Sequence, residues 1–144
     1  MGFKKAAILF PSLIALGVLY LIYTSFYPTD SFYKEDFEFI TKIELPKSAN
    51  IITKDANYPD IHGKYSSVAV VKLSINDYNV LLDRIKKDSS FTPQSHIGTG
   101  SIYHEITSGI DQKEIIKIFR KKKMIIAFLN DNSRIILERQ ISDY

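Results

Sequence analysis

The densest group of polar residues suited to chemistry is the segment Tyr58-Pro59-Asp60-Ile61-His62-Gly63. Asp60 can accept a hydrogen bond from His62 and fix its tautomer, and Gly63 permits a positive φ or a close backbone approach. Catalysis would also need a nucleophile or a bound metal here, and the spacing identifies neither. We therefore expect a tight turn in which Asp60 caps backbone amides. A binding role for Asp60, His62 and Gly63 is the second interpretation, and no catalytic residue is assigned.

The three histidines, His62, His96 and His104, could gather around a metal ion with Asp60 or Glu105. No pair of them has the H-x-x-x-H spacing of a helical metal site, and the chain has no cysteine to supply a thiolate. We therefore predict neither a metal nor any other cofactor. His104 is expected on the apolar side of a strand as a core residue, and His96 is expected in a loop.

Arg120-Lys121-Lys122-Lys123 is the one run of adjacent charges. Beside a bilayer, these cations could contact anionic headgroups, each contributing about 1 kcal/mol. The simpler interpretation is a solvated turn or helix end whose lysines discourage strand pairing between molecules. A nucleic-acid partner is not expected: without Lys4 and Lys5, 17 of the 19 basic residues remain against 16 acidic ones.

An uncharged segment of 22 residues runs from Ala6 to Tyr27. As a helix it is long enough to cross the ~30 Å hydrocarbon core of a membrane. Lysines precede it and acidic residues follow it, which places the N-terminus in the cytoplasm. We therefore predict a cytoplasmic N-terminus at 1–5, a transmembrane anchor in the lipid bilayer at 6–27 and an extracytoplasmic domain at 28–144. This describes a single-pass protein of the cell inner membrane.

A cleaved signal peptide is the alternative interpretation of the N-terminal segment. The apolar run exceeds the usual ~7–15 residues of a signal peptide, and no Ala-x-Ala-like cleavage site follows Tyr23. An uncleaved signal-anchor is therefore preferred.

Residues 28–144 are enough for one domain with its own core. Hydrophobic periodicity predicts helices at 33–42 and 74–87, and strands at 49–55, 65–73, 101–107, 124–129 and 134–139. Residues 88–100 have no periodicity and are expected to form a long exposed loop. Residues 111–121 stay open, because Asp111 with Glu114 favours a helix start whereas alternating isoleucines favour a strand.

Together these elements predict an α+β fold behind the transmembrane helix. We expect a mostly antiparallel sheet of about four to six strands, with one or two helices packed on one face. The helix at 74–87 has the clearest signals, because Ser74 can cap it and apolar residues recur at spacings of three and four. Asn130 to Ser133 is expected to be the polar loop of a hairpin.

The Asp60-x-His62-Gly63 turn lies between Pro46-Lys47-Ser48-Ala49 and the pattern Leu73-Ser74-x-x-Asp77-Tyr78-x-x-Leu81-Leu82, with a fainter match at Phe128-Leu129-Asn130-Asp131. In these features, residues 36–85 resemble small bacterial exported or membrane-anchored proteins of uncharacterised families. The resemblance implies a bacterial envelope protein and supplies no catalytic residues. Such relatives are often lipoproteins, from which this chain departs by having no cysteine.

The sequence thus predicts a membrane-anchored envelope protein that acts as a binding or interaction module, with another envelope protein as its partner. One alternative is an immunity protein against a toxin delivered into the periplasm. The other is a small enzyme or ligand-binding domain centred on Asp60 and His62, with residues 88–100 as a lid.

Overall fold

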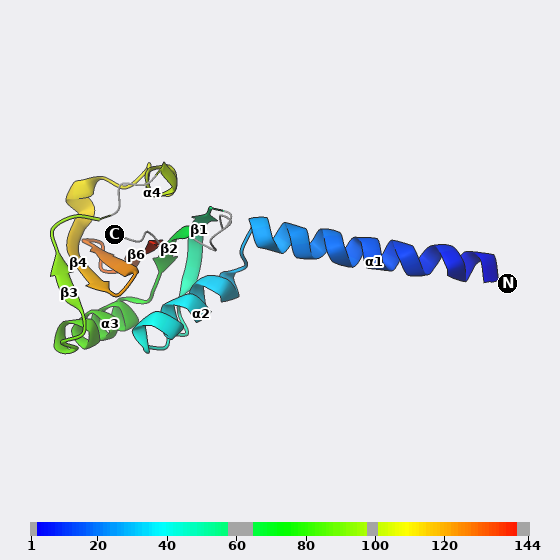
Figure 1. Ribbon diagram of the computed structural model, residues 1–144. Helices are drawn as coiled ribbons and strands as arrows, with labels where there is room; N and C mark the ends of the chain where they lie inside the picture. Colours follow the sequence, from blue (N-terminus) through cyan, green and yellow to red (C-terminus); the bar gives the residue numbers. More distant parts are fainter. Residues whose placement is uncertain (1–2, 58–64, 98–100, 141–144) are drawn as a thin grey trace.

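The computed structural model describes residues 3–57, 65–97 and 101–140. Its helical elements are α1 (Phe3–Phe26), α2 (Asp30–Thr41), α3 (Ile75–Lys87), α4 (Ser101–Ile106) and the 3-10 turn η1 (Gln112–Glu114). Its strands are β1 (Asn50–Ala56), β2 (Ser66–Lys72), β3 (Thr92–Gln94), β4 (Ile115–Lys121), β5 (Met124–Leu129) and β6 (Arg134–Gln140). Helix α1 extends away from the domain that the other elements form (Figure 1).

The strands form one antiparallel sheet in the order β1-β2-β6-β5-β4-β3. The chain therefore carries the expected α+β arrangement, and β2 lies inside the sheet between β1 and β6. Strands β2, β5 and β6 are buried along most of their length. Strands buried on both faces need a layer on each side, because an uncovered face would expose apolar side chains to water.

The first face of the sheet is covered by α2 and α3 (Figure 1). Ser74 caps α3, since its hydroxyl accepts a hydrogen bond from the amide of Asp77 at 3.1 Å. One side of α3 buries residues spaced by three and four positions: Tyr78, Leu81, Leu82 and Ile85. Helix α2 starts three residues before the predicted boundary and ends at Thr41. The next residue, Lys42, has a left-handed φ of 61°, which stops the helix.

A polar cluster fastens α2 to the end of β6. The guanidinium of Arg139 forms an ion pair with Asp36 and lies 4.8 Å from the ring centroid of Tyr65. Burial lowers the pKa of Arg139, because the charged form loses solvation. The cluster thus fixes how α2 lies across the strands.

The second face has its own apolar cluster, which the sequence analysis did not foresee. It comprises Val68 and Val70 of β2, Ala127 and Leu129 of β5, Ile136 of β6 and Tyr103 of α4. The predicted strand at 101–107 is wrong, because the backbone there forms helix α4. Tyr103 and Ile106, three residues apart in α4, both pack on this cluster, so the alternation of apolar residues was misleading.

The long loop predicted at 88–100 is partly wrong, since Thr92 to Gln94 form the edge strand β3. Its three residues pair with Ile118 to Arg120 of β4, and Pro93 weakens the periodic signal. The open segment at 111–121 contains both alternatives in turn. Asp111 and Glu114 form a capping box around η1, and β4 follows directly.

The transmembrane prediction is wrong. No helix among the described residues is long and apolar enough to cross a membrane. The prediction counted residues without charge at 6–27, whereas membrane insertion depends on the hydropathy of every side chain. The single-pass inner-membrane localisation rested on this segment and is wrong as well.

Candidate functional sites

The first candidate is the exposed side-chain surface of α1, which we name the α1 apolar surface. Its large side chains are 48–64% exposed: Leu13, Ile14, Leu16, Val18, Leu19, Tyr20, Leu21, Ile22, Tyr23 and the following Tyr27. Contiguous apolar surface of this kind is rare on monomeric proteins unless it binds something. No side chain between Pro11 and Thr24 is charged, so nothing in this stretch would favour an ionic partner.

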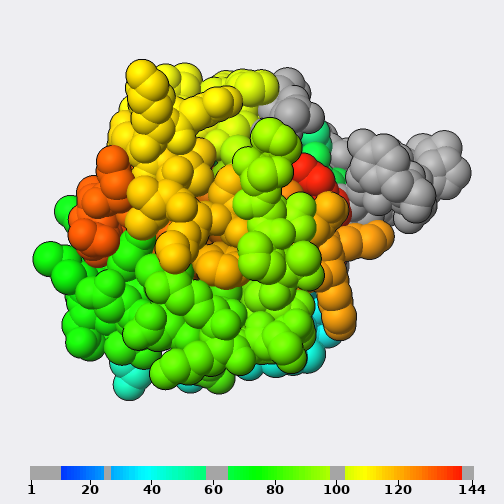
Figure 2. Space-filling view, turned by 90° about the vertical axis from the view of Figure 1, so that its left-hand side faces the viewer, coloured from blue at the N-terminus to red at the C-terminus, as the bar shows by residue number. Residues whose placement is uncertain are grey.

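The second candidate is a pocket of about 250 Å³ on the second face of the sheet, near the β3–β4 edge. It is lined by Ser95, His96, Ile97, His104, Gln112, Ile115 and Ile118. We name it the histidine pocket. In Figure 2 the yellow-green segment that follows β3 and the yellow segment leading into β4 lie on either side of this hollow.

The pocket exists because the chain leaves the sheet edge after β3. Pairing with β4 stops at Gln94 opposite Ile118, and the next three residues line the pocket instead of continuing the strand. His104 comes from α4, where it follows the buried Tyr103. The two rings meet edge to face with centroids 5.7 Å apart, which restricts the orientation of the imidazole.

The lining divides into two chemical parts. Ser95, His96, His104 and Gln112 are exposed and offer hydroxyl, imidazole and carboxamide groups. Ile97, Ile115 and Ile118 are half-buried and pack against the second core cluster. The pocket can therefore combine hydrogen bonds with burial of an apolar group.

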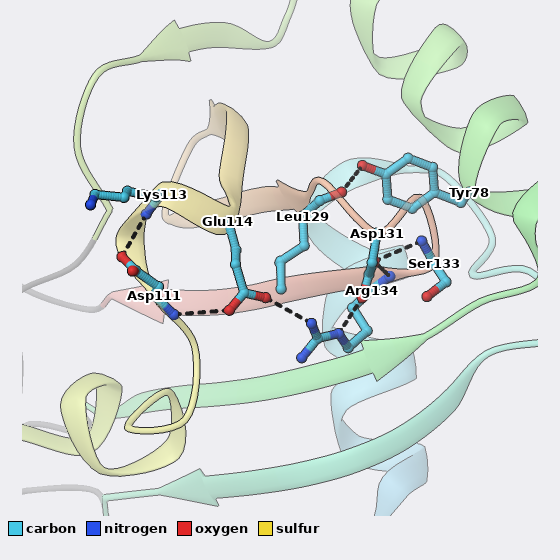
Figure 3. Close-up of polar contacts among 8 residues, drawn as sticks. All are labelled: Tyr78, Asp111, Lys113, Glu114, Leu129, Asp131, Ser133 and Arg134. Carbon is cyan, nitrogen blue, oxygen red and sulfur yellow. Dashed lines mark hydrogen bonds and ion pairs between the residues drawn. The ribbon is translucent and has the colours of Figure 1, made fainter.

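A polar network holds η1, and with it Gln112, against the β5–β6 hairpin (Figure 3). Glu114 accepts hydrogen bonds from the amide of Asp111 at 3.2 Å and from Nη2 of Arg134 at 2.8 Å. Arg134 also forms an ion pair with Asp131, whose Oδ1 accepts from the amide of Ser133 at 2.9 Å. These contacts satisfy backbone groups and join two turns, which is a structural role.

The same network has a clear electrostatic signature. Partial burial works against ionisation of Asp131, but hydrogen bonds from Arg134 and Ser133 outweigh it and lower the pKa of the carboxyl. Nearby, the hydroxyl of Tyr78 donates to the carbonyl oxygen of Leu129 at 2.6 Å. Burial raises the pKa of Tyr78 to about 12, and the charge of Asp131 adds to the effect.

The predicted binding residues Asp60, His62 and Gly63 lie outside the described residues, so their role stays a prediction. Of the histidines, His96 and His104 come together at the histidine pocket. His104 is exposed there and is not the core residue that was expected. Within the described ranges, no group of three or more metal-ligating side chains is present.

The basic run lies at the end of β4 and in the β4–β5 turn. Lys121 points into the domain, where its Nζ donates to the carbonyl oxygen of Thr41 at 2.7 Å and to Asp88 at 3.2 Å. Arg120 binds the carbonyl oxygen of Lys122, whose φ of 55° shapes the turn. Lys121 is thus a structural residue, and the run Arg120 to Lys123 does not present four cations on one surface.

Sequence reasoning missed most of the histidine pocket. Ser95, Gln112 and Ile118 belong to no short motif, and they meet only because α4 and η1 fold over the second face. The available signal was the apolar run Val68 to Val71, which required a covering layer on both faces.

We found no match to this chain among protein-family models, curated proteins or solved structures.

Proposed function

We propose that this protein is an interaction module that binds another protein through the α1 apolar surface. The observation that carries the proposal is the row of large side chains on α1 that are about half to two thirds exposed. Scattered apolar residues are normal on a protein surface, but a helix that exposes them continuously, as α1 does from Leu13 to Tyr23, is not.

The chemistry of α1 indicates the kind of partner. A helix of 24 residues is about 36 Å long, enough to span a small domain or a groove between helices. Burying one leucine or isoleucine side chain contributes about 1.5–3 kcal/mol. The partner would therefore be a protein with an elongated apolar groove or helix face. Tyr20 and Tyr23 could also hydrogen-bond at its rim.

The test compares the full chain with Leu16→Gln/Leu19→Gln, which places two amides three residues apart on one side of α1. A partner co-purified with the tagged full chain is identified by mass spectrometry, purified and titrated against both proteins. We expect the double variant to bind at least tenfold more weakly, since two buried leucines are lost. Ile75→Gln is the matched control, because Ile75 is 65% exposed on the domain and lies outside α1.

Equal affinity of the chain and its double variant would overturn the proposal. So would light scattering in which the full chain is a dimer and the double variant a monomer, because the partner of the α1 apolar surface would then be a second copy of the chain. The immunity-protein hypothesis stays a prediction, since no contact in the structure favours a toxin over other proteins.

A further inference from the structure

We propose that the histidine pocket binds a carboxylate group carried on a short aliphatic chain. This inference is independent of α1, since every lining residue belongs to the domain. It rests on the division of the pocket into a hydrogen-bonding wall and an isoleucine floor.

The wall can donate hydrogen bonds to an acceptor group, and its lining offers a cation no carboxylate partner. A neutral imidazole offers one N–H donor, a serine one O–H donor and a glutamine two N–H donors, so the wall can donate to several oxygen atoms at once. The lining contains no aspartate or glutamate that would repel a carboxylate or neutralise an amine. A carboxylate oxygen accepts stronger hydrogen bonds than a neutral group does.

A metal ion fits the pocket less well. Only His96 and His104 among the lining residues are common metal ligands, whereas protein zinc sites use three or four side chains. The described part of the chain holds no third histidine, cysteine or carboxylate that would complete such a group.

The isoleucine floor and the pocket volume determine the chemistry and the size of the apolar part of the ligand. Ile97, Ile115 and Ile118 offer an apolar contact, and each methylene group buried against it contributes about 0.8 kcal/mol to the binding free energy. A volume of about 250 Å³ lies below that of pockets for drug-sized ligands. The part of the ligand that enters the pocket is therefore a carboxylate with an aliphatic chain of about four to six carbon atoms. Two sources carry this chemistry: a free short-chain acid, and the C-terminal aliphatic residue of a peptide.

The test is ligand-observed NMR of the full chain with hexanoate, hexanol and hexylamine, and with N-acetyl-leucine and its amide. We expect saturable binding of the two carboxylates and not of the uncharged or cationic analogues. Tighter binding of N-acetyl-leucine than of hexanoate would identify a peptide C-terminus as the source, and the reverse order a free acid. Either order supports the shared chemistry.

His96→Ala and His104→Ala should each weaken hexanoate binding about tenfold, because each removes one hydrogen bond to a charged group. These variants also separate the pocket from apolar adsorption on α1, which neither histidine influences. Ser108→Ala is the control, since Ser108 is exposed in the α4–η1 turn and does not line the pocket. Circular dichroism establishes that each variant is folded.

Three results would overturn the proposal. The first is binding of hexanol or hexylamine as tight as that of hexanoate. The second is unchanged hexanoate binding in both folded histidine variants. The third is no saturable carboxylate binding in the millimolar range.

Discussion

Lys121 connects the ends of three elements through one side chain that is only 12% exposed. Its ammonium group lies over the ring of Phe91, 4.7 Å from the centroid, while it donates to Thr41 and Asp88. The aliphatic stem can pack in the core while the charge reaches polar partners at the rim. A cation that looked like a surface feature in the sequence therefore holds α2, α3 and β4 together.

Asp88 makes this junction sensitive to acid. Hydrogen bonds from the hydroxyl and amide of Ser90, followed by Lys121, lower its pKa from 3.8 to about 2. Because the folded state holds this proton less tightly than the unfolded state, its stabilising effect is present above about pH 4 and is lost as pH falls toward 2. We expect Asp88→Asn to lower the urea midpoint at pH 6 and to change it much less at pH 2.

Asp83→Asn is the matched control for Asp88, because its carboxylate is 66% exposed and lies 3.8 Å from Lys86. An exposed pair of this kind adds little to stability. If Asp88→Asn lowered the urea midpoint equally at pH 6 and pH 2, the result would contradict the ionic explanation.

Tyr78 shows the opposite dependence on pH. Its folded-state pKa of about 12 lies above the ordinary value of 10, so its contribution to stability is complete below pH 10 and is lost as pH rises toward 12. Tyr78→Phe should lower the free energy of unfolding at pH 7 by about 1–2 kcal/mol, because the buried hydrogen bond from its hydroxyl to the carbonyl of Leu129 is lost. Urea titrations at pH 7 and pH 11 measure both effects.

Tyr27→Phe serves as the control for Tyr78, since Tyr27 is 64% exposed. If Tyr78→Phe and Tyr27→Phe had the same small effect at pH 7, the hydroxyl of Tyr78 would not be a structural hydrogen-bond donor.

At the scale of elements, the junction between η1 and the β5–β6 hairpin depends on the pair Glu114 and Arg134. Both side chains are about 30% exposed, and the N–O distance is 2.8 Å. A double-mutant cycle with Glu114→Gln and Arg134→Met should give a coupling energy of about 0.5–1 kcal/mol. The same cycle on Asp83 and Lys86 should give a coupling energy near zero. If the two pairs had equal coupling energies, the Glu114–Arg134 pair would add no stability beyond that of an exposed ion pair.

How far these elements could be predicted depends on whether their signals are local. The cap at Ser74 and the apolar spacing of α3 lie within one segment, so that helix was predicted within one residue at its start. The β5–β6 hairpin was predicted for the same reason. Helix α4 has only six residues, too few for a periodic pattern to separate a helix from a strand, and its packing on the second face distinguishes the two.

The candidate sites follow the same division. His96 and His104 were recognised as residue types that do chemistry, but their meeting requires β3 to end and α4 to fold back over the sheet. Gln112 reaches the pocket through the capping box of η1, which was one of the two alternatives left open for residues 111–121. A site assembled by tertiary packing leaves no fixed spacing in the sequence.

The whole molecule divides into a domain with two core clusters and a helix whose described side chains contribute to neither. All the clustered residues lie between Phe32 and Leu137. Because α1 buries no core side chain among its described residues, we expect the chain shortened to residues 28–144 to fold by itself. Its urea midpoint should equal that of the full chain.

The shortened chain separates folding from binding. It should keep carboxylate binding at the histidine pocket, whose lining residues are all retained, and it should lose the protein partner bound through α1. Urea unfolding, NMR titration and partner affinity measure these three properties on one pair of proteins. A fall in stability of more than about 1 kcal/mol would mean that α1 folds back on the domain. Its exposed side chains would then serve folding, and the proposed protein interaction would lose its physical basis.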